Sequence, residues 1–160
     1  MGLLDVFKKK EICIASPMKG TCVSIKEVSD PTFGDEILGK GVAVKPVDGR
    51  VCAPEDGVVT TVFPTGHAVG ITTKDEVELL IHVGIDTVKM DGRGFQIKCQ
   101  DGQEVKKGDL LIEADLDLIR QEGYDTITPV VVCNSDDFSQ IMKQTDGEVA
   151  AGDTILTLKK

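Results

Sequence analysis

The protein has 160 residues, 41% of them hydrophobic, with a formal net charge of −9, five cysteines and no tryptophan. This length suits one domain that buries its own core, and the acidic balance excludes nucleic acid as a partner and favours a basic protein surface. The cysteines are odd in number and lack C-x-x-C spacing, so we expect small buried thiols, with neither a disulfide framework nor a zinc knuckle.

The first ten residues, MGLLDVFKKK, are too short for the apolar region of a signal peptide. Their apolar face and three lysines resemble a membrane-surface helix, but one turn buries little area, so residues 1–10 are predicted to be a frayed tail. The chain has no 18-residue apolar run, and a cytoplasmic protein with one domain over residues 11–160 is expected.

Turn signals follow one another closely from residue 16 onward, including SPMKG, DPTFGD, PVDG, PEDG, PTGH and MDGRG. Short apolar segments such as GVAVKP, GVVTTVF and TPVVVC separate them, a rhythm typical of an all-β antiparallel sandwich or barrel. Two short helices are predicted, at 115–123 and at 136–144. Ser135 or Asp136 would cap the second, with Phe138, Ile141 and Met142 on one face.

Internal similarity indicates duplicated β-units within this one domain. Residues 16–25 echo residues 53–62, and EVKKGDLLI at 104–112 matches EVAAGDTIL at 148–156. Gly108 and Gly152 then occupy equivalent turns that need a positive φ before a strand resumes.

The two histidines of the chain, His67 and His82, flank a predicted hairpin with the sequence HAVGITTKDEVELLIH. A loop centred on Lys74 and Asp75 places His67 directly opposite His82, with both rings on one face. A three-residue loop would shift the pairing by one and put the rings on opposite faces.

Alternation along the second strand turns Val77, Leu79, Ile81, Val83 and Ile85 to one side and Glu78, Leu80, His82, Gly84 and Asp86 to the other. His82 therefore lies on the more polar face. Because Gly84 lacks a side chain, we expect open space for a ligand beside it.

Paired imidazoles fit three chemistries. The first is metal binding, as in a zinc hydrolase, with Asp86 as the nearest third ligand. The second is general acid–base catalysis on a small substrate, and the third is nucleophilic attack on phosphorus. In the third, one neutral imidazole attacks while the other imidazole or a hydroxyl hydrogen-bonds the phosphoryl oxygens.

The segments LLIHVGIDTVKMDGRGF and PTGHAVGI, with GVAVKP, APEDG, VKKGD and TPVVVCN around them, resemble glucose-type enzyme IIA of the bacterial phosphoenolpyruvate-dependent sugar phosphotransferase system. The resemblance covers residues 11–160 and implies a β-sandwich with two histidines side by side in a shallow apolar depression. It also implies phosphoryl transfer from HPr to a cysteine of the enzyme IIB domain of a sugar permease, with no cofactor. Such a carrier is expected to be a monomer that meets the membrane only through the permease.

Carried over by motif, the resemblance makes His82 the phosphorylated residue, through Nε2. His67 matches the partner that hydrogen-bonds the phosphoryl group, and Thr65 matches the hydroxyl that supports His67. Predicted contacts for partner proteins are the acidic pair Asp30 and Asp86, the apolar rim of Phe33, Ile37, Leu38 and Phe63, and Gly84. No metal is required, although the two imidazoles can bind zinc adventitiously. Glu76 departs from the pattern, because many relatives have a turn glycine there.

A competing interpretation comes from biotinyl and lipoyl carrier domains, which also contain duplicated β-units with V-x-x-G-D-x-[LI] segments. Lys19 in SPMKG would then hold the cofactor, although the flanking M-K-M pattern of those domains is missing.

Overall fold

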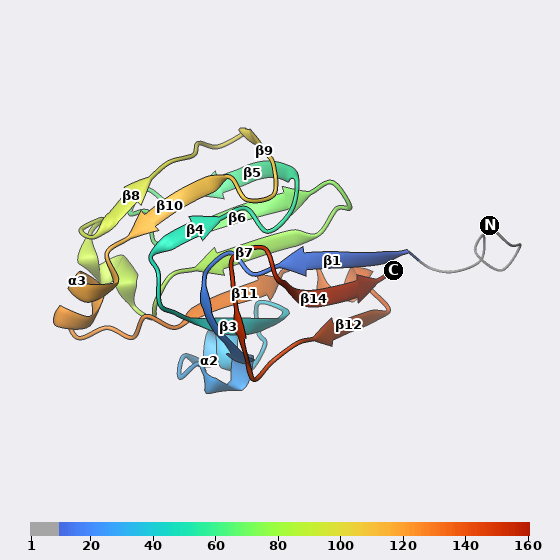
Figure 1. The fold of residues 1–160 in the computed structure, drawn as a ribbon, viewed down its shortest axis with the longest axis horizontal. Coiled ribbons are helices and arrows are strands. Elements are labelled where there is room, and N and C mark those ends of the chain that lie inside the picture. Colours follow the sequence, from blue (N-terminus) through green and yellow to red (C-terminus); the bar gives the residue numbers. More distant parts are fainter. Residues whose placement is uncertain (1–9) are drawn as a thin grey trace, which may run out of the picture.

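The computed structural model describes residues 10–160 (Figure 1). The predicted tail, residues 1–10, therefore lies outside the described residues except for Lys10, whose Nζ donates to Asp75 Oδ1 at 2.8 Å. The first strand begins at Glu11 and the last ends at Lys159. In residues 10–160, no helix combines the length and the apolar character needed to cross a bilayer.

Residues 10–160 form three antiparallel sheets, which confirm the predicted all-β sandwich. The largest has eight strands, in the order β13 (Gly147–Val149), β2 (Gly20–Ser24), β3 (Lys40–Pro46), β11 (Thr128–Val132), β7 (Glu78–His82), β6 (Ala68–Thr73), β5 (Gly57–Val62) and β9 (Glu104–Val105). One small sheet contains β1 (Glu11–Ala15), β14 (Thr154–Lys159) and β12 (Gln140–Lys143). The other contains β4 (Arg50–Cys52), β10 (Leu110–Ala114) and β8 (Phe95–Ile97).

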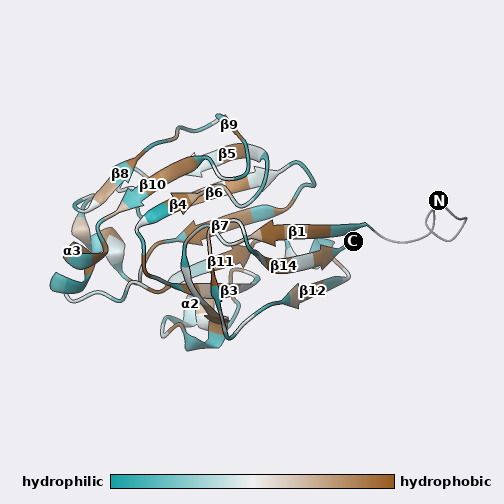
Figure 2. Ribbon diagram, viewed as in Figure 1, coloured by the Kyte–Doolittle hydropathy of each residue, from teal (hydrophilic) through white to brown (hydrophobic). Residues whose placement is uncertain are grey.

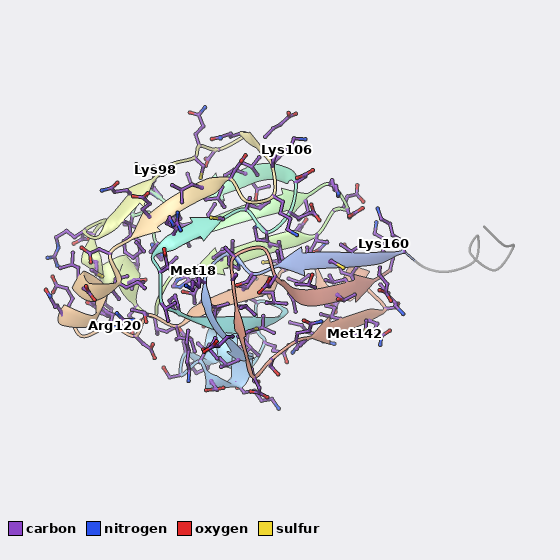
Figure 3. All side chains as sticks on the ribbon, viewed as in Figure 1. Met18, Lys98, Lys106, Arg120, Met142 and Lys160 are labelled. Carbon is purple, nitrogen blue, oxygen red and sulfur yellow. The ribbon has the colours of Figure 1, made fainter. Side chains whose placement is uncertain are left out.

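The main core lies between the large sheet and the two small sheets. Its members include Ile14 of β1, Leu156 of β14, Ile112 of β10 and the inward residues Leu79 and Ile81 of β7. Figure 2 shows the hydrophobic colouring concentrated on these strands. In Figure 3, the labelled Lys98, Lys106, Arg120 and Lys160 extend outward, whereas Met18 is fully buried.

A second apolar cluster occupies the opposite face of the large sheet. It is built from alternate residues of β2, β3, β11 and β7 and from the 3-10 helix η1 (Ile25–Glu27) and helix α2 (Pro31–Gly34). Its members are Val23, Ile25, Val28, Phe33, Ala43, Ile85, Ile127 and Val131, with Leu80 packed against them. Ile85 was predicted to share the face of Ile81. It lies in this second cluster because β7 ends at His82 and Gly84, with φ of 77°, turns the chain.

One of the two predicted helices is confirmed. Helix α3 (Leu116–Gln121) lies within 115–123, and the side chain of Asp115 caps it by accepting from Leu118 N. The helix predicted at 136–144 is wrong. There the chain forms the 3-10 helix η3 (Ser135–Asp137) and then β12, which pairs with β14 from Gln140–Lys159 to Lys143–Leu156. Pairing with a neighbouring strand satisfies the backbone, which outweighs a weak helical pattern.

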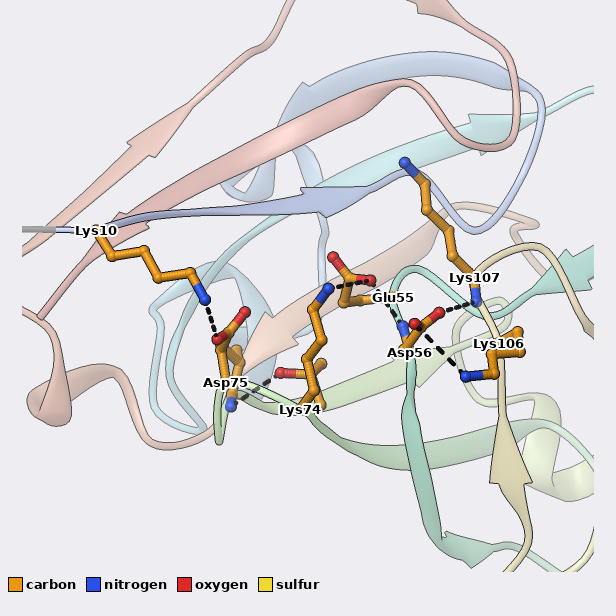
Figure 4. Close-up of polar contacts among 9 residues, drawn as sticks. Lys10, Glu55, Asp56, Lys74, Asp75, Lys106 and Lys107 are labelled. Carbon is orange, nitrogen blue, oxygen red and sulfur yellow. Dashed lines mark hydrogen bonds and ion pairs between the residues drawn. The ribbon is translucent and has the colours of Figure 1, made fainter. Parts of the chain in front are cut away.

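The hairpin of β6 and β7 has a different register from the predicted one. Ala68, not His67, is opposite His82, and Ile71 is opposite Leu79. The cause is a three-residue loop: Thr73 N donates to Val77 O at 3.0 Å, and Glu76 adopts a left-handed φ of 63°. Figure 4 shows the loop residues Lys74 and Asp75, which pair with Glu55 and Lys10 respectively.

The predicted duplication is visible in matching contacts. Ser16 N donates to Asp153 O at 2.7 Å, and Gly152 N donates to Ser16 O at 3.0 Å. In the equivalent place, Ala53 N donates to Asp109 O at 2.8 Å, and Gly108 N donates to Ala53 O at 2.9 Å. Gly108 and Gly152 have φ of 94° and 101°, as their predicted turns require.

The cysteines are all free thiols, but they are not all buried. Cys22 is buried, Cys52 and Cys99 are half-buried, and Cys13 and Cys133 are exposed. Cys13 occupies an outward position of β1 between the buried Ile12 and Ile14, and Cys133 follows directly after the last residue of β11. The prediction of buried thiols is therefore wrong for these two.

Candidate functional site

The two imidazoles meet despite the shifted register. Their ring centroids lie 4.9 Å apart with the planes at 80°. His82 is the last residue of β7, whereas His67 precedes β6 and follows Gly66, whose φ is 74°. Because His67 lies outside the regular strand, the alternation of side chains does not turn its ring to the opposite face. Its carbonyl still accepts from Val83 N at 2.7 Å, which ties the two chain segments together.

A main-chain carbonyl sets the tautomer of His82. Nδ1 lies 2.7 Å from the carbonyl oxygen of Gly84. A carbonyl oxygen only accepts, so Nδ1 carries the proton and the neutral ring keeps its free lone pair on Nε2. His82 is half-buried, so part of this residue remains accessible to solvent.

His67 is less exposed to solvent than His82. Only 3% of its surface is exposed, and its Nδ1 is 2.5 Å from the hydroxyl of Thr65. Burial, followed by the neighbouring His82, lowers the pKa of His67 from 6.5 to about 4. His67 is therefore neutral at physiological pH, and the hydroxyl can donate to Nδ1 or accept from it.

His82 is also biased towards its neutral form, although two carboxylates oppose this. Burial lowers its pKa, while the bond to Gly84 O and the charges of Asp30 and Asp86 act to raise it. Asp30 caps α2 by accepting from Thr32 N at 2.9 Å. Asp86 has a left-handed φ of 61° and precedes the 3-10 helix η2 (Thr87–Met90).

Aromatic side chains flank both imidazoles. The Phe33 ring lies 4.9 Å from the His82 ring, and the Phe63 ring lies 5.3 Å from the His67 ring, edge to face. Phe33 is only 5% exposed and packs against His82 in the interior, whereas Phe63 is 36% exposed. Ile37 and Leu38, which follow α2, are 70% and 40% exposed.

The expected open space beside Gly84 is absent. A Cβ at this position would lie 2.6 Å from the Thr87 methyl carbon and 2.8 Å from Asp125 O. Thr87, which sequence reasoning missed, fills the space from inside the loop. The available signal was its place in H-V-G-I-D-T-V, five residues after His82.

The alternative interpretations find less support in the geometry. In residues 10–160, no group of three or more His, Cys, Asp or Glu side chains is arranged to hold a metal, so His67 and His82 lack a third ligand there. Lys19 lies between β1 and β2, which belong to different sheets, and is therefore not at the tip of a hairpin.

Comparison with known proteins agrees with this geometry. The sequence matches the family described as phosphoenolpyruvate-dependent sugar phosphotransferase system, EIIA 1, over residues 12–138. Over 152 residues it is 43% identical to the PTS system glucose-specific EIIA component of Buchnera aphidicola, covering 95% of this chain and 94% of that one. It is also 42% identical over 147 residues to the PTS system beta-glucoside-specific EIIBCA component of Halalkalibacterium halodurans. That match covers 92% of this chain and 23% of the longer relative.

The fold has a close counterpart in glucose permease IIA from Mycoplasma capricolum. The TM-score is 0.89 at 35% sequence identity, and the match covers 99% of this chain and 100% of that one. Sequence and structure thus agree over nearly the whole length of the chain. The chain belongs to the EIIA 1 family of the phosphoenolpyruvate-dependent sugar phosphotransferase system.

Proposed function

We propose that this protein is a cytoplasmic, monomeric phosphocarrier that accepts a phosphoryl group on Nε2 of His82 and passes it to a cysteine of an enzyme IIB domain, supporting sugar uptake. The observation that carries the proposal is the bond from Nδ1–H of His82 to Gly84 O. It leaves Nε2 as the nucleophilic atom of a half-buried ring whose pKa is lowered by burial.

The transfer is a pair of in-line displacements. Nε2 of His82 attacks the phosphorus of phospho-HPr, an N–P bond forms, and the donor imidazole leaves with the electron pair of its broken N–P bond. In the second step the acceptor thiolate attacks the same phosphorus, and His82 leaves as a neutral imidazole. No cofactor enters either step, because positioning and charge stabilisation supply the catalysis.

His67 stabilises the phosphoryl group in this scheme. Donation from the Thr65 hydroxyl to Nδ1 of His67 keeps the ring proton on Nε2, from which it reaches a phosphoryl oxygen. The low solvent exposure of His67 supports this division of roles. With 3% of its surface exposed, it is inaccessible to a protein donor but touches the ring that carries the group.

The surface around His82 fits transient protein partners. The exposed Ile37, Leu38 and Phe63 supply apolar area, and Asp30 and Asp86 supply negative charge for a basic partner such as HPr. An enzyme IIB partner is supported by the EIIBCA relative, whose name joins an A component with B and C components in one chain.

The test is phosphorylation by phosphoenolpyruvate, enzyme I and HPr, followed by mass spectrometry. The wild-type protein should gain one phosphoryl group through a bond that survives base and breaks in acid. His82→Gln should remove the adduct. His67→Gln should still be labelled but pass the group to enzyme IIB about 10²–10³-fold more slowly, as expected when one hydrogen bond to the transferring group is lost. Undiminished labelling of a folded His82→Gln protein would refute the assignment.

A further inference from the structure

Thr87 makes two contacts inside the loop that follows His82. Its hydroxyl donates to the carbonyl oxygen of Val83 at 2.5 Å, and its methyl group lies under Gly84, filling the space where a Cβ would stand. Thr87 itself is fully buried. The hydroxyl and the methyl group of Thr87 therefore both contact the segment formed by Val83 and Gly84.

That segment determines the state of His82. The Gly84 carbonyl accepts the Nδ1 proton of His82, and its direction depends on the backbone on either side of it. On the preceding side, Val83 is fixed through its amide by His67 O and through its carbonyl by Thr87. On the following side, Ile85 N donates to Asp125 O at 3.1 Å.

We infer that Thr87 is a positioning residue for His82: by holding residues 83–84 it keeps the Gly84 carbonyl on Nδ1 and the free lone pair on Nε2. The inference rests on His82 being the phosphoryl acceptor. Gly84 has a left-handed φ of 77°, and because glycine lacks a Cβ its backbone can leave this conformation at little cost unless its neighbours restrain it. Without the Thr87 hydroxyl, the Val83 carbonyl loses its hydrogen-bond donor, and the loop shifts so that this carbonyl can find another donor.

Four variants separate the hydroxyl from the methyl group. Thr87→Val keeps the shape of the side chain and removes the hydroxyl. Thr87→Ser and Thr87→Ala both lack the methyl group and differ from each other only in the hydroxyl. Thr73→Val is the matched control, because Thr73 is also buried and its hydroxyl accepts from Val77 N at the other end of the same hairpin.

The first readout is the pair of ¹⁵N chemical shifts of the His82 ring, which distinguish protonated from unprotonated nitrogens. Wild type, Thr87→Ser and Thr73→Val should show Nδ1–H alone, whereas Thr87→Val and Thr87→Ala should show a mixture of the two tautomers. The second readout is phosphoryl transfer from HPr, which should fall about 10-fold or more in the two variants without the hydroxyl, as when a supporting hydrogen bond to a catalytic histidine is lost.

The ring shifts do not depend on phosphorylation, so they test Thr87 even if His82 never accepts a phosphoryl group. Wild-type shifts and rate in Thr87→Val would overturn the inference. Equal changes in the Thr87→Ser and Thr87→Ala proteins would also overturn it, by assigning the effect to packing alone. If Thr87→Val does not fold, the comparison of Thr87→Ser with Thr87→Ala still tests the role of the hydroxyl.

Discussion

The two histidines have identical side chains but differ in solvent exposure and in their hydrogen-bond partners. His82 bonds to a carbonyl, which fixes its proton on Nδ1, whereas His67 bonds to the Thr65 hydroxyl, which can donate or accept. The neutral His82 ring thus keeps its free lone pair on Nε2, whereas His67 can carry its proton on either nitrogen. The sequence predicts that these rings meet, but it contains no direct measure of depth or tautomer. Both depend on loops that only the folded chain brings together.

The pKa of His67 predicts how stability changes in acid. The folded value, about 4, is below the unfolded value of about 6.5, so folding favours the neutral ring. This contribution is fully present above pH 6.5 and is lost as the pH falls towards 4. Between pH 7.5 and pH 5 the loss is about 2 kcal/mol from the shift of His67 to about 4.

Urea unfolding of the wild type and of His67→Gln at both pH values measures this loss. On acidification, the variant should lose about 2 kcal/mol less stability than the wild type. His82 contributes in the same direction in both proteins, because burial lowers its pKa as well. Equal losses in the two proteins would show that His67 is not the group responsible.

At the level of elements, the hairpin shows why a register is difficult to predict from loop composition. TTKDEV contains no Asn-Gly or Asp-Gly that would fix the turn, so turn chemistry alone does not decide between the expected loop centred on Lys74 and Asp75 and a loop of three residues. The actual three-residue loop places a left-handed residue, Glu76, at its last position. The turn glycine that the family resemblance implies at this position was a local sign of that loop.

Glu76→Gly should stabilise the protein by about 0.5–1 kcal/mol. Its φ of 63° is unfavourable for a side chain with a Cβ and costs a glycine little. The ion pair with Lys160, at 3.7 Å, contributes little because the Glu76 side chain is 83% exposed. Glu76→Gln is the control, since it removes the charge and keeps the strained backbone. A gain in the midpoint of urea unfolding for both variants would assign the effect to charge instead.

The segment at 136–144 illustrates a second limit. Phe138, Ile141 and Met142 suit a helical face, yet β14 offers a partner that is distant in sequence. Short apolar segments are ambiguous until the neighbouring chain is known. In contrast, α3 was predictable because Asp115 provides a local cap, and local signals do not depend on tertiary context.

The whole molecule follows an approximate two-fold pattern. In the large sheet, the outer pairs β13–β2 and β9–β5 correspond to the two halves of the repeat, and each small sheet supplies the strand that follows the repeated turn. Two bonds join the halves reciprocally: Ala15 N donates to Pro54 O, and Cys52 N donates to Pro17 O. The sequence indicated this duplication because it is recorded in matching motifs.

The repeat predicts equal responses at its two turns. Gly108→Ala and Gly152→Ala should each destabilise the protein by about 1 kcal/mol, because both glycines have positive φ and no atom lies within 4 Å of an added Cβ. Gly147→Ala is the control. It has the same empty surroundings without a positive φ, so its stability should stay at or above that of the wild type. Thermal unfolding of the three variants decides the matter, and a loss at only one turn would contradict the equivalence.

The short edge strands of the large sheet limit the tendency of the protein to aggregate. Both outermost strands are very short: β9 has 2 residues and β13 has 3. Unpaired backbone groups along a sheet edge invite strands of other molecules to join, and a brief edge offers too few of them to hold a visitor. Two molecules that meet at these sheet edges can therefore separate again, so edge-to-edge aggregation is disfavoured.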